Sequence, residues 1–159
     1  MALEVASDVA AYGLFQIAFA SLDTRLSRCL VKLCRCQNAA LAFSTFRRKP
    51  FGHRLQLIRK AIKPVASDTV VSEEVRELQS GLDLADSVRK WRNERIHAEV
   101  RFTGEGQPVI VDETGRPLHF DIDECDRKIR EAIRAAVVIE AAVPHLVAYE
   151  MDLQELMDE

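Results

Sequence analysis

The segment KWRNERIHAEV, residues 90–100, brings together side chains that can bind phosphate and transfer protons. Arg92 keeps its charge at physiological pH and presents a planar fork of donors that suits phosphate oxygens. His97 suits proton transfer near neutral pH, because the ordinary pKa of His is about 6.5. Asn93 can orient an imidazole or hold the end of a helix. We therefore take Arg92, Asn93 and His97 as the candidate catalytic residues.

These residues lie near the end of a predicted helix, about 73–101, whose apolar pattern begins at Val75. At about 100° per residue, Asn93 projects on the same side as Val75 and Leu82, so the core-facing stripe turns polar there. Two interpretations stay open. Asn93 and His97 either find hydrogen-bond partners inside the core, or they line a cleft where polar side chains meet a ligand.

The charges of the chain are divided unevenly along the sequence. The net charge is −3, but residues 1–102 carry +6 and residues 103–159 carry −9. Residues 24–67 hold 11 basic residues and no acidic one. A solvated basic face is the simpler explanation, whereas a polyanionic partner such as RNA explains why acids are absent. The candidate RNA-binding residues are Arg47, Arg48, Lys49, Arg54, Arg89, Lys90 and Arg95.

Three aromatic residues, Phe43, Phe46 and Phe51, alternate with basic residues in this region. They can stack on the bases of single-stranded RNA, or they can pin the segment to the core and leave only the charges in water. The four cysteines lack paired metal-binding spacing, so we interpret them as packing residues and expect no metal and no cofactor.

The remaining pattern predicts an all-α, up-and-down bundle of four to five helices with a small β-hairpin inserted before the last helix. The hairpin, about 106–121, consists of PVIVD and RPLHF around a Glu-Thr-Gly turn. Ile129, Ile133, Ala136, Val137 and Ile139 are expected to face inward from the last helix, and Pro144 is expected to kink or break it. The predicted helices are about 4–36, 50–63, 73–101 and 124–150, with a short apolar segment at 39–46.

The chain is long enough for one domain, 1–159, that ends in a short acidic tail at 151–159. No stretch is a convincing membrane span, and the N-terminus carries acids where a signal peptide needs basic residues. We therefore expect a cytoplasmic protein.

The motif Arg92-Asn93-x-x-x-His97 resembles the R-x4–6-H signature of the HEPN superfamily, which lies near the end of a bundle helix. The long first helix and the segment Phe51-Gly-His-Arg-Leu55 are similar to small stand-alone bacterial HEPN-like proteins. In pattern the likeness covers roughly residues 10–150, and residues 92–97 carry the specific motif. The resemblance implies an all-α domain that forms a homodimer, with two motifs meeting in a shared cleft.

The resemblance also implies a metal-independent endoribonuclease of a bacterial defence or toxin–antitoxin system, with RNA as substrate and an antitoxin or other protein as a candidate partner. Arg92 would bind the phosphate, His97 would transfer protons, and Asn93 would orient the imidazole. Other HEPN-like proteins are inactive modules that bind RNA, nucleotides or proteins, and this alternative stays open. One toxin branch carries Tyr two residues after the His, where this chain has Glu99, which argues against that branch.

Overall fold

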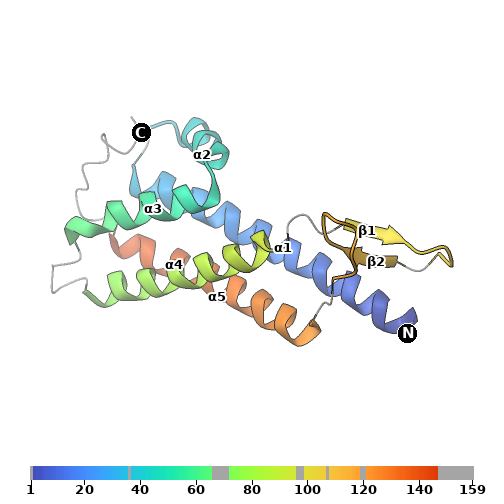
Figure 1. Cartoon of the computed structure of the whole chain (residues 1–159). Helices are drawn as coiled ribbons and strands as arrows, with labels where there is room; N and C mark the ends of the chain where they lie inside the picture. Colours follow the sequence, from blue (N-terminus) through green and yellow to red (C-terminus); the bar gives the residue numbers. More distant parts are fainter. Residues whose placement is uncertain are drawn as a thin grey trace.

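The computed structural model describes residues 2–35, 37–65, 72–95, 99–106, 108–118 and 121–146. It confirms a mainly helical bundle with a two-stranded hairpin before the last helix (Figure 1). A short 3-10 turn, Lys63–Val65, follows the third helix. The elements are α1 (Ala2–Leu33), α2 (Ala39–Arg48), α3 (Phe51–Ile62), α4 (Ser72–Asn93), β1 (Glu99–Phe102), β2 (Pro108–Val111) and α5 (Ile122–Leu146).

Helices α1, α3 and α5 run in one direction, and α4 runs in the opposite direction (Figure 1). The short helix α2 returns the chain, so that α3 starts beside the middle of α1, where Phe51 stacks on Phe19. Helix α4 then runs back along α3 and α5, and Lys128 of α5 binds the Ser87 hydroxyl at 2.9 Å. Helix α5 packs along both α1 and α4, and therefore lies at the centre of the bundle's contacts.

The core-facing side of α5 differs from the prediction. Ala136 and Ile139 are buried and Ile129 is partly buried, as expected, but Ile133 and Val137 are exposed. Small residues take the positions that face α1 and α4, because they let the helix axes approach closely. They are Ala132, Ala135, Ala136 and Ala142.

Helix α4 ends at Asn93, eight residues before its predicted end, and residues 99–102 form strand β1. The prediction that residues 99–101 are helical is therefore wrong. Strand β2 coincides with the predicted PVIV run, but it pairs with β1 rather than with the segment after the Glu-Thr-Gly turn. That segment returns only as far as one bridge between Val111 and Pro117.

The turn between β2 and Pro117 has a local cause. The Asp112 carboxylate accepts hydrogen bonds from the backbone N–H groups of Thr114 and Arg116, and Gly115 takes a φ of 80° that suits glycine. Beside the bridge, the Asp112 N–H donates to the Arg116 carbonyl and the Leu118 N–H donates to the Ile110 carbonyl, both at 2.9 Å. The described part of the segment after this turn, up to Leu118, therefore lies along β2 without forming a strand of its own.

Pro144 lies inside α5, two residues before its last described residue, Leu146. The predicted continuation of this helix to 150 and the acidic tail at 151–159 fall outside the described residues. Within the described part of the chain, no helix combines the length and apolarity needed to cross a bilayer. Cys29 and Cys125 are buried in the core, and burial raises the pKa of Cys29 to about 12 and that of Cys125 to about 11.

Candidate functional site

Two of the three motif residues lie in the last turn of α4. Arg92 and Asn93 are the final residues of that helix, whereas His97 lies outside the described residues. The predicted helix, about 73–101, would carry all three motif residues, but α4 ends at Asn93.

Asn93 is exposed, which excludes for this residue the interpretation that it finds hydrogen-bond partners inside the core. The buried positions continue through Ala85, Val88 and Trp91, each three residues after the last. Each step of three advances about 300° round a helix, so each step turns the buried stripe back by about 60°, and Trp91 points about 160° away from Val75. Trp91 thus takes the core position, and the side chain of Asn93 is free to reach a ligand.

Arg92 is half-buried, and the ring of Phe19 holds its guanidinium. The guanidinium carbon lies 4.7 Å from the centroid of that ring. The Nε atom is buried without a hydrogen-bond partner, and Arg92 makes no ion pair with any residue that the structure describes. A guanidinium stacked by its face keeps its edge donors available, so Arg92 is a candidate receptor for an anion.

Phe19 belongs to a stack that joins three helices. Its ring lies on that of Phe51 with centroids 4.9 Å apart and planes 26° from parallel. On the far side, the Arg54 guanidinium lies 5.6 Å from the Phe51 centroid. Arg92 and Arg54 therefore enclose the two rings, and Arg92 is oriented by side chains of α1 and α3.

Arg54 itself is a structural residue, with 3% of its surface exposed. It forms an ion pair with Asp23, donates to the Asp23 carbonyl at 2.9 Å and donates to the Ser27 hydroxyl at 2.6 Å. These contacts direct its donors into the bundle. Arg54, which the sequence placed among the RNA-binding residues, is not accessible to RNA in this structure.

The neighbouring candidates Arg89 and Lys90 share one carboxylate. Asp86 accepts from Arg89 at 2.8 Å and pairs with Lys90 at 3.0 Å. Partial burial opposes ionisation of Asp86, but the hydrogen bonds from Lys90 and Arg89 outweigh it and lower the pKa of Asp86. Arg89 also covers Gly52 of α3, where an added Cβ would lie 3.6 Å from its Nε. Arg89 is thus on the same side of α4 as the Phe51 ring.

Arg95 stacks on the ring of Trp91 at 4.3 Å and pairs with Glu94 and Glu124, both at 3.2 Å. Its charge is therefore balanced within the bundle. Arg47 is likewise engaged, since it donates to the Thr24 hydroxyl at 2.6 Å.

Arg48 and Lys49 remain without an ion pair among the described residues. They lie where α2 ends, directly before Pro50 and α3. Of the aromatic residues that alternate with them, Phe46 and Phe51 are buried, at 1% and 9% exposed. These two rings pin the segment to the core rather than stack on bases.

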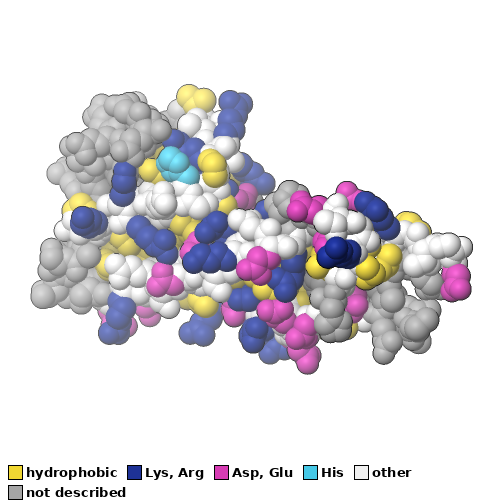
Figure 2. Space-filling view, in the orientation of Figure 1, with side chains coloured by type: hydrophobic (Ala, Val, Ile, Leu, Met, Phe, Trp, Pro, Cys, Tyr) yellow, Lys and Arg dark blue, Asp and Glu magenta, His cyan; other side chains and the backbone are white. Residues whose placement is uncertain are grey.

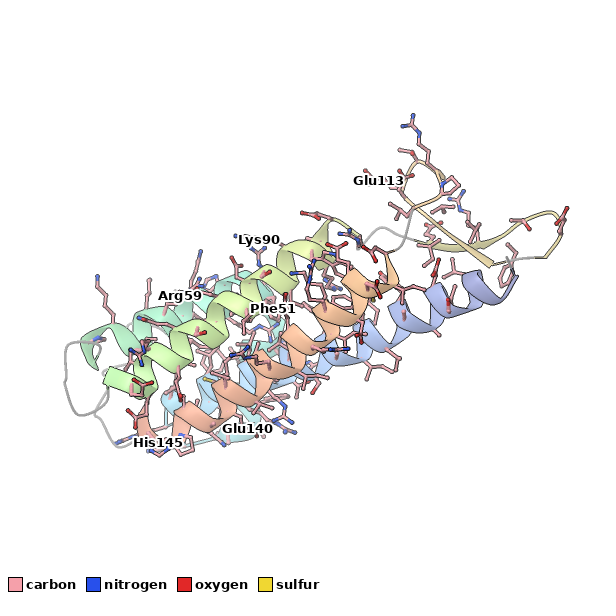
Figure 3. All side chains as sticks on the ribbon, turned by 90° about the horizontal axis from the view of Figure 1, so that it is seen from below. Phe51, Arg59, Lys90, Glu113, Glu140 and His145 are labelled. Carbon is pink, nitrogen blue, oxygen red and sulfur yellow. The ribbon has the colours of Figure 1, made fainter. Side chains whose placement is uncertain are left out.

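A feature that the sequence did not suggest is an open groove between α4 and α5. Its volume is about 550 Å³, and its lining carries both signs of charge. Trp91 and Lys128 form part of it, and so does Lys90, which Figure 3 labels on α4. Because Lys90 and Arg92 are two residues apart on a helix, they point about 200° apart. Lys90, a predicted RNA-binding residue, and Arg92, a predicted catalytic residue, therefore lie on different faces of α4.

The basic residues do not form one continuous patch. Figure 2 shows Lys and Arg side chains along α3 and α4 with Asp and Glu side chains among them. The acid-free segment is flanked in space by acids of α4, as the pair of Arg59 with Asp83 at 2.8 Å illustrates. No family model matches this chain, and comparison with curated proteins and with solved structures gives no match either.

Proposed function

We propose that this chain is a HEPN-like, metal-independent endoribonuclease in which Arg92, Asn93 and His97 carry the chemistry. The observation that supports the proposal most strongly is the state of Arg92. Its guanidinium is fixed on the ring of Phe19 and has no carboxylate partner among the described residues. An unpaired, oriented cation is what stabilisation of a developing phosphorane requires.

The proposed reaction is an internal transfer at one phosphodiester. The 2′-hydroxyl loses its proton and attacks phosphorus, the bond to the 5′-oxygen breaks, and that oxygen gains a proton. The products carry a 2′,3′-cyclic phosphate and a 5′-hydroxyl. His97 serves as a proton carrier, because its ordinary pKa of about 6.5 lies near neutral pH. Arg92 stabilises the charge on the phosphate oxygens, and Asn93 orients the imidazole.

The RNA strand is proposed to approach over the junction of α2 and α3. Arg48 and Lys49 are the cations in this region without an internal ion pair among the described residues, and Arg89 lies beside Gly52 at the start of α3. They would contact the phosphates next to the one bound by Arg92. The proposal includes a homodimer, a role in bacterial defence or a toxin–antitoxin pair, and an antitoxin or other protein partner in the cytoplasm.

The test is cleavage of end-labelled single-stranded RNA in EDTA by the wild type, Arg92→Ala and His97→Ala. Arg76→Ala is the matched control, because Arg76 is an exposed arginine of the same helix, paired with Glu73. We expect cyclic-phosphate ends from the wild type and the control, and none from the two motif variants, all with similar melting temperatures. Equal cleavage by folded Arg92→Ala and His97→Ala would refute the proposal.

The alternative is an inactive HEPN-like module that binds RNA or another partner. The unpaired state of Arg48 and Lys49 supports this alternative, because it needs only free cations and no catalytic group. It predicts binding without cleavage, weakened by added salt and by Arg48→Ala with Lys49→Ala. Affinity that does not change between low and high salt would exclude RNA binding of this kind.

A further inference from the structure

An aromatic stripe of α1 lies against the end of α4. Its residues recur at steps of three and four, so they share one side of the helix, and they are Tyr12, Phe15 and Phe19. The rings of Phe15 and Trp91 meet edge to face, with centroids 4.6 Å apart. Phe19 carries the Arg92 guanidinium. Two of the three aromatic residues thus contact the last turn of α4.

The third aromatic residue contacts the chain just beyond the helix. The hydroxyl of the partly buried Tyr12 donates a hydrogen bond to the backbone carbonyl of Arg95, with 3.4 Å between the two oxygens. Arg95 follows two residues after Asn93, where α4 ends. Carbonyl groups at the end of a helix have no N–H partner in the helix, and other donors must satisfy them. Tyr12 supplies such a donor from a different helix.

Arg95 is also held by its side chain. Its guanidinium lies 4.3 Å from the centroid of the Trp91 ring and donates to the Trp91 carbonyl at 3.4 Å. It pairs with Glu124, at the start of α5, at 3.2 Å. The backbone N–H of Arg95 donates to the Arg92 carbonyl at 2.9 Å. Contacts from α1, α4 and α5 therefore meet at this one residue.

The contact with Tyr12 differs in kind from the contacts of the Arg95 side chain. The peptide group is planar, so the direction of a carbonyl and the direction in which the next residue follows are fixed together. Side-chain contacts hold Arg95 in place, but they do not set the direction of its carbonyl. A donor on the carbonyl oxygen sets the path of the chain beyond Arg95, and Tyr12 is that donor.

Arg95 lies between two of the catalytic candidates in the sequence. Arg92 comes three residues before it, and His97 comes two residues after it. Two residues of chain span at most about 7 Å, so His97 is tied closely to Arg95. One stripe of α1 thus acts on Arg92 directly and on the chain that leads to His97.

We infer that Tyr12 is a positioning residue of the proposed ribonuclease site. Its hydroxyl directs the chain where it leaves α4, and thereby sets His97 against the phosphate that Arg92 binds. Tyr12 itself needs no contact with RNA. Misplacing a reacting group by about 1 Å can lower the rate about a hundredfold, so a distant anchor is able to control turnover. The inference rests on the proposed function, because that function assigns the proton transfer to His97.

The hydroxyl of Tyr12 can be removed without removing its ring. Tyr12→Phe keeps the packing of the ring against the core and deletes the donor to the Arg95 carbonyl. Phe15 and Trp91 do not allow such a change, because they are buried core residues and truncation of either would leave a cavity. Tyr12→Phe therefore separates the hydrogen bond from the packing of the stripe.

The test is steady-state cleavage of end-labelled single-stranded RNA in EDTA by the wild type and by Tyr12→Phe, both as the full chain. We expect kcat to fall at least about tenfold and KM to stay within about twofold, because the cations proposed to bind the strand are unchanged. A melting temperature and a circular dichroism spectrum close to those of the wild type establish that the variant is folded. Thr45→Val is the matched control, since it deletes a hydroxyl that donates to the Leu41 carbonyl at 2.9 Å within α2. It should leave kcat unchanged.

Two further measurements separate positioning from general loosening of the helix end. Glu124→Gln weakens a contact of the Arg95 side chain and leaves its carbonyl bound, so kcat should fall less than about twofold. Hydrogen exchange followed by NMR needs no RNA. The N–H groups of Glu94 and Arg95 donate to carbonyls of the last turn of α4. Both should exchange at least about fivefold faster in Tyr12→Phe than in the wild type and in Thr45→Val.

A Tyr12→Phe variant that cleaves RNA at the rate of an active wild type would overturn the inference and leave the proposed function standing. Equal losses of kcat in Tyr12→Phe and Glu124→Gln, or unchanged exchange of the two amides, would overturn it as well. A wild type that does not cleave RNA fails the proposed function itself, and the assignment of Tyr12 falls with it.

Discussion

At the scale of single residues, the same side-chain type serves two purposes in this protein. Arg54 and Arg92 cover the two ends of one pair of stacked rings. Arg54 is buried and bound to Asp23, so it holds α1 and α3 together. Arg92 lies over the other ring without an anion among the described residues, so its charge is available to a ligand. The difference comes from what surrounds each guanidinium, and the sequence around it gives no such information.

Arg92→Lys tests whether the planar guanidinium matters, rather than the charge alone. An ammonium group cannot stack on Phe19 or present two parallel donors. We predict that cleavage falls at least about tenfold, about 1.4 kcal/mol in transition-state stabilisation, with an unchanged melting temperature. Arg76→Lys, measured in the same single-turnover assay, should cleave like the wild type. Full activity of Arg92→Lys would show that stacking on Phe19 is irrelevant to the reaction.

Arg54→Met should destabilise the fold by about 3 kcal/mol, because it leaves the partly buried carboxylate of Asp23 without its main partner. Urea unfolding monitored by circular dichroism measures this loss. Arg59→Met is the control, because Arg59 and Asp83 form an exposed pair, worth at most about 1 kcal/mol. Similar losses from both substitutions would mean that burial of the Arg54 pair does not matter.

Asp86 links stability to pH, since Lys90 and Arg89 lower its pKa in the folded chain. The ionised Asp86 carboxylate contributes fully to the free energy of unfolding above its unfolded pKa of about 3.9. This contribution is lost as the pH falls through the lower pKa of the folded chain. We therefore predict that the free energy of unfolding falls less steeply with acid in Asp86→Asn than in the wild type. Urea titrations at a series of acidic pH values around and below the unfolded pKa measure this slope. Identical slopes would remove Asp86 as a contributor.

At the scale of elements, the packing of α5 depends on small residues on both sides. Gly81 of α4 faces Val138 and Ile139, and an added Cβ would lie 3.0 Å from one and 3.2 Å from the other. Four alanines on the buried side of α5 complete the close approach. This explains why Ile133 and Val137 are left outside, against the prediction. The apolar pattern identified the helix, but it did not rank alanine above isoleucine as the contact residue.

Gly81→Leu should destabilise the bundle by about 2 kcal/mol, because the added side chain overpacks the contact with α5. The exposed neighbour Ser80 gives the matched control, and Ser80→Leu should change the free energy of unfolding by less than about 0.5 kcal/mol. Thermal melts of the two variants at one concentration make the comparison. A Gly81→Leu variant as stable as Ser80→Leu would show that α4 and α5 can separate at little cost.

The helices were largely predictable, whereas the end of α4 and the pairing of the hairpin were not. Periodicity and the turn residues at Pro50 and Asp121 place α3 and α5 within a few residues. The segment 39–46, predicted only as a short apolar segment, belongs to helix α2, whose N-cap is Asn38. Beyond Asn93 the residues still suit a helix, and only pairing with β2 draws residues 99–102 into a strand. A fixed step of 100° per residue also does not show that the buried stripe of α4 turns to Trp91 and leaves Asn93 exposed.

At the scale of the whole molecule, the acid-free segment does not produce a basic surface of its own. Arg47 and Arg54 are bound to groups of α1, and Arg59 is bound to Asp83 of α4. Folding thus neutralises part of the charge excess that the sequence shows. Arg48 at the end of α2, Lys49 directly after it and Arg92 of α4 make no ion pair among the described residues. Only the fold shows that these cations are left without an acidic partner there.

The central proposal is that the chain cleaves RNA through the 2′-hydroxyl without a metal. The most direct measurement compares one RNA sequence with its fully 2′-O-methylated copy, both end-labelled, incubated in EDTA with the wild type and with Arg92→Ala. The proposal predicts cleavage of the unmodified strand alone, by the wild type alone, to products with 2′,3′-cyclic phosphate ends. Cleavage of the methylated strand, or cleavage of the unmodified strand by Arg92→Ala at the rate of the wild type, would contradict it.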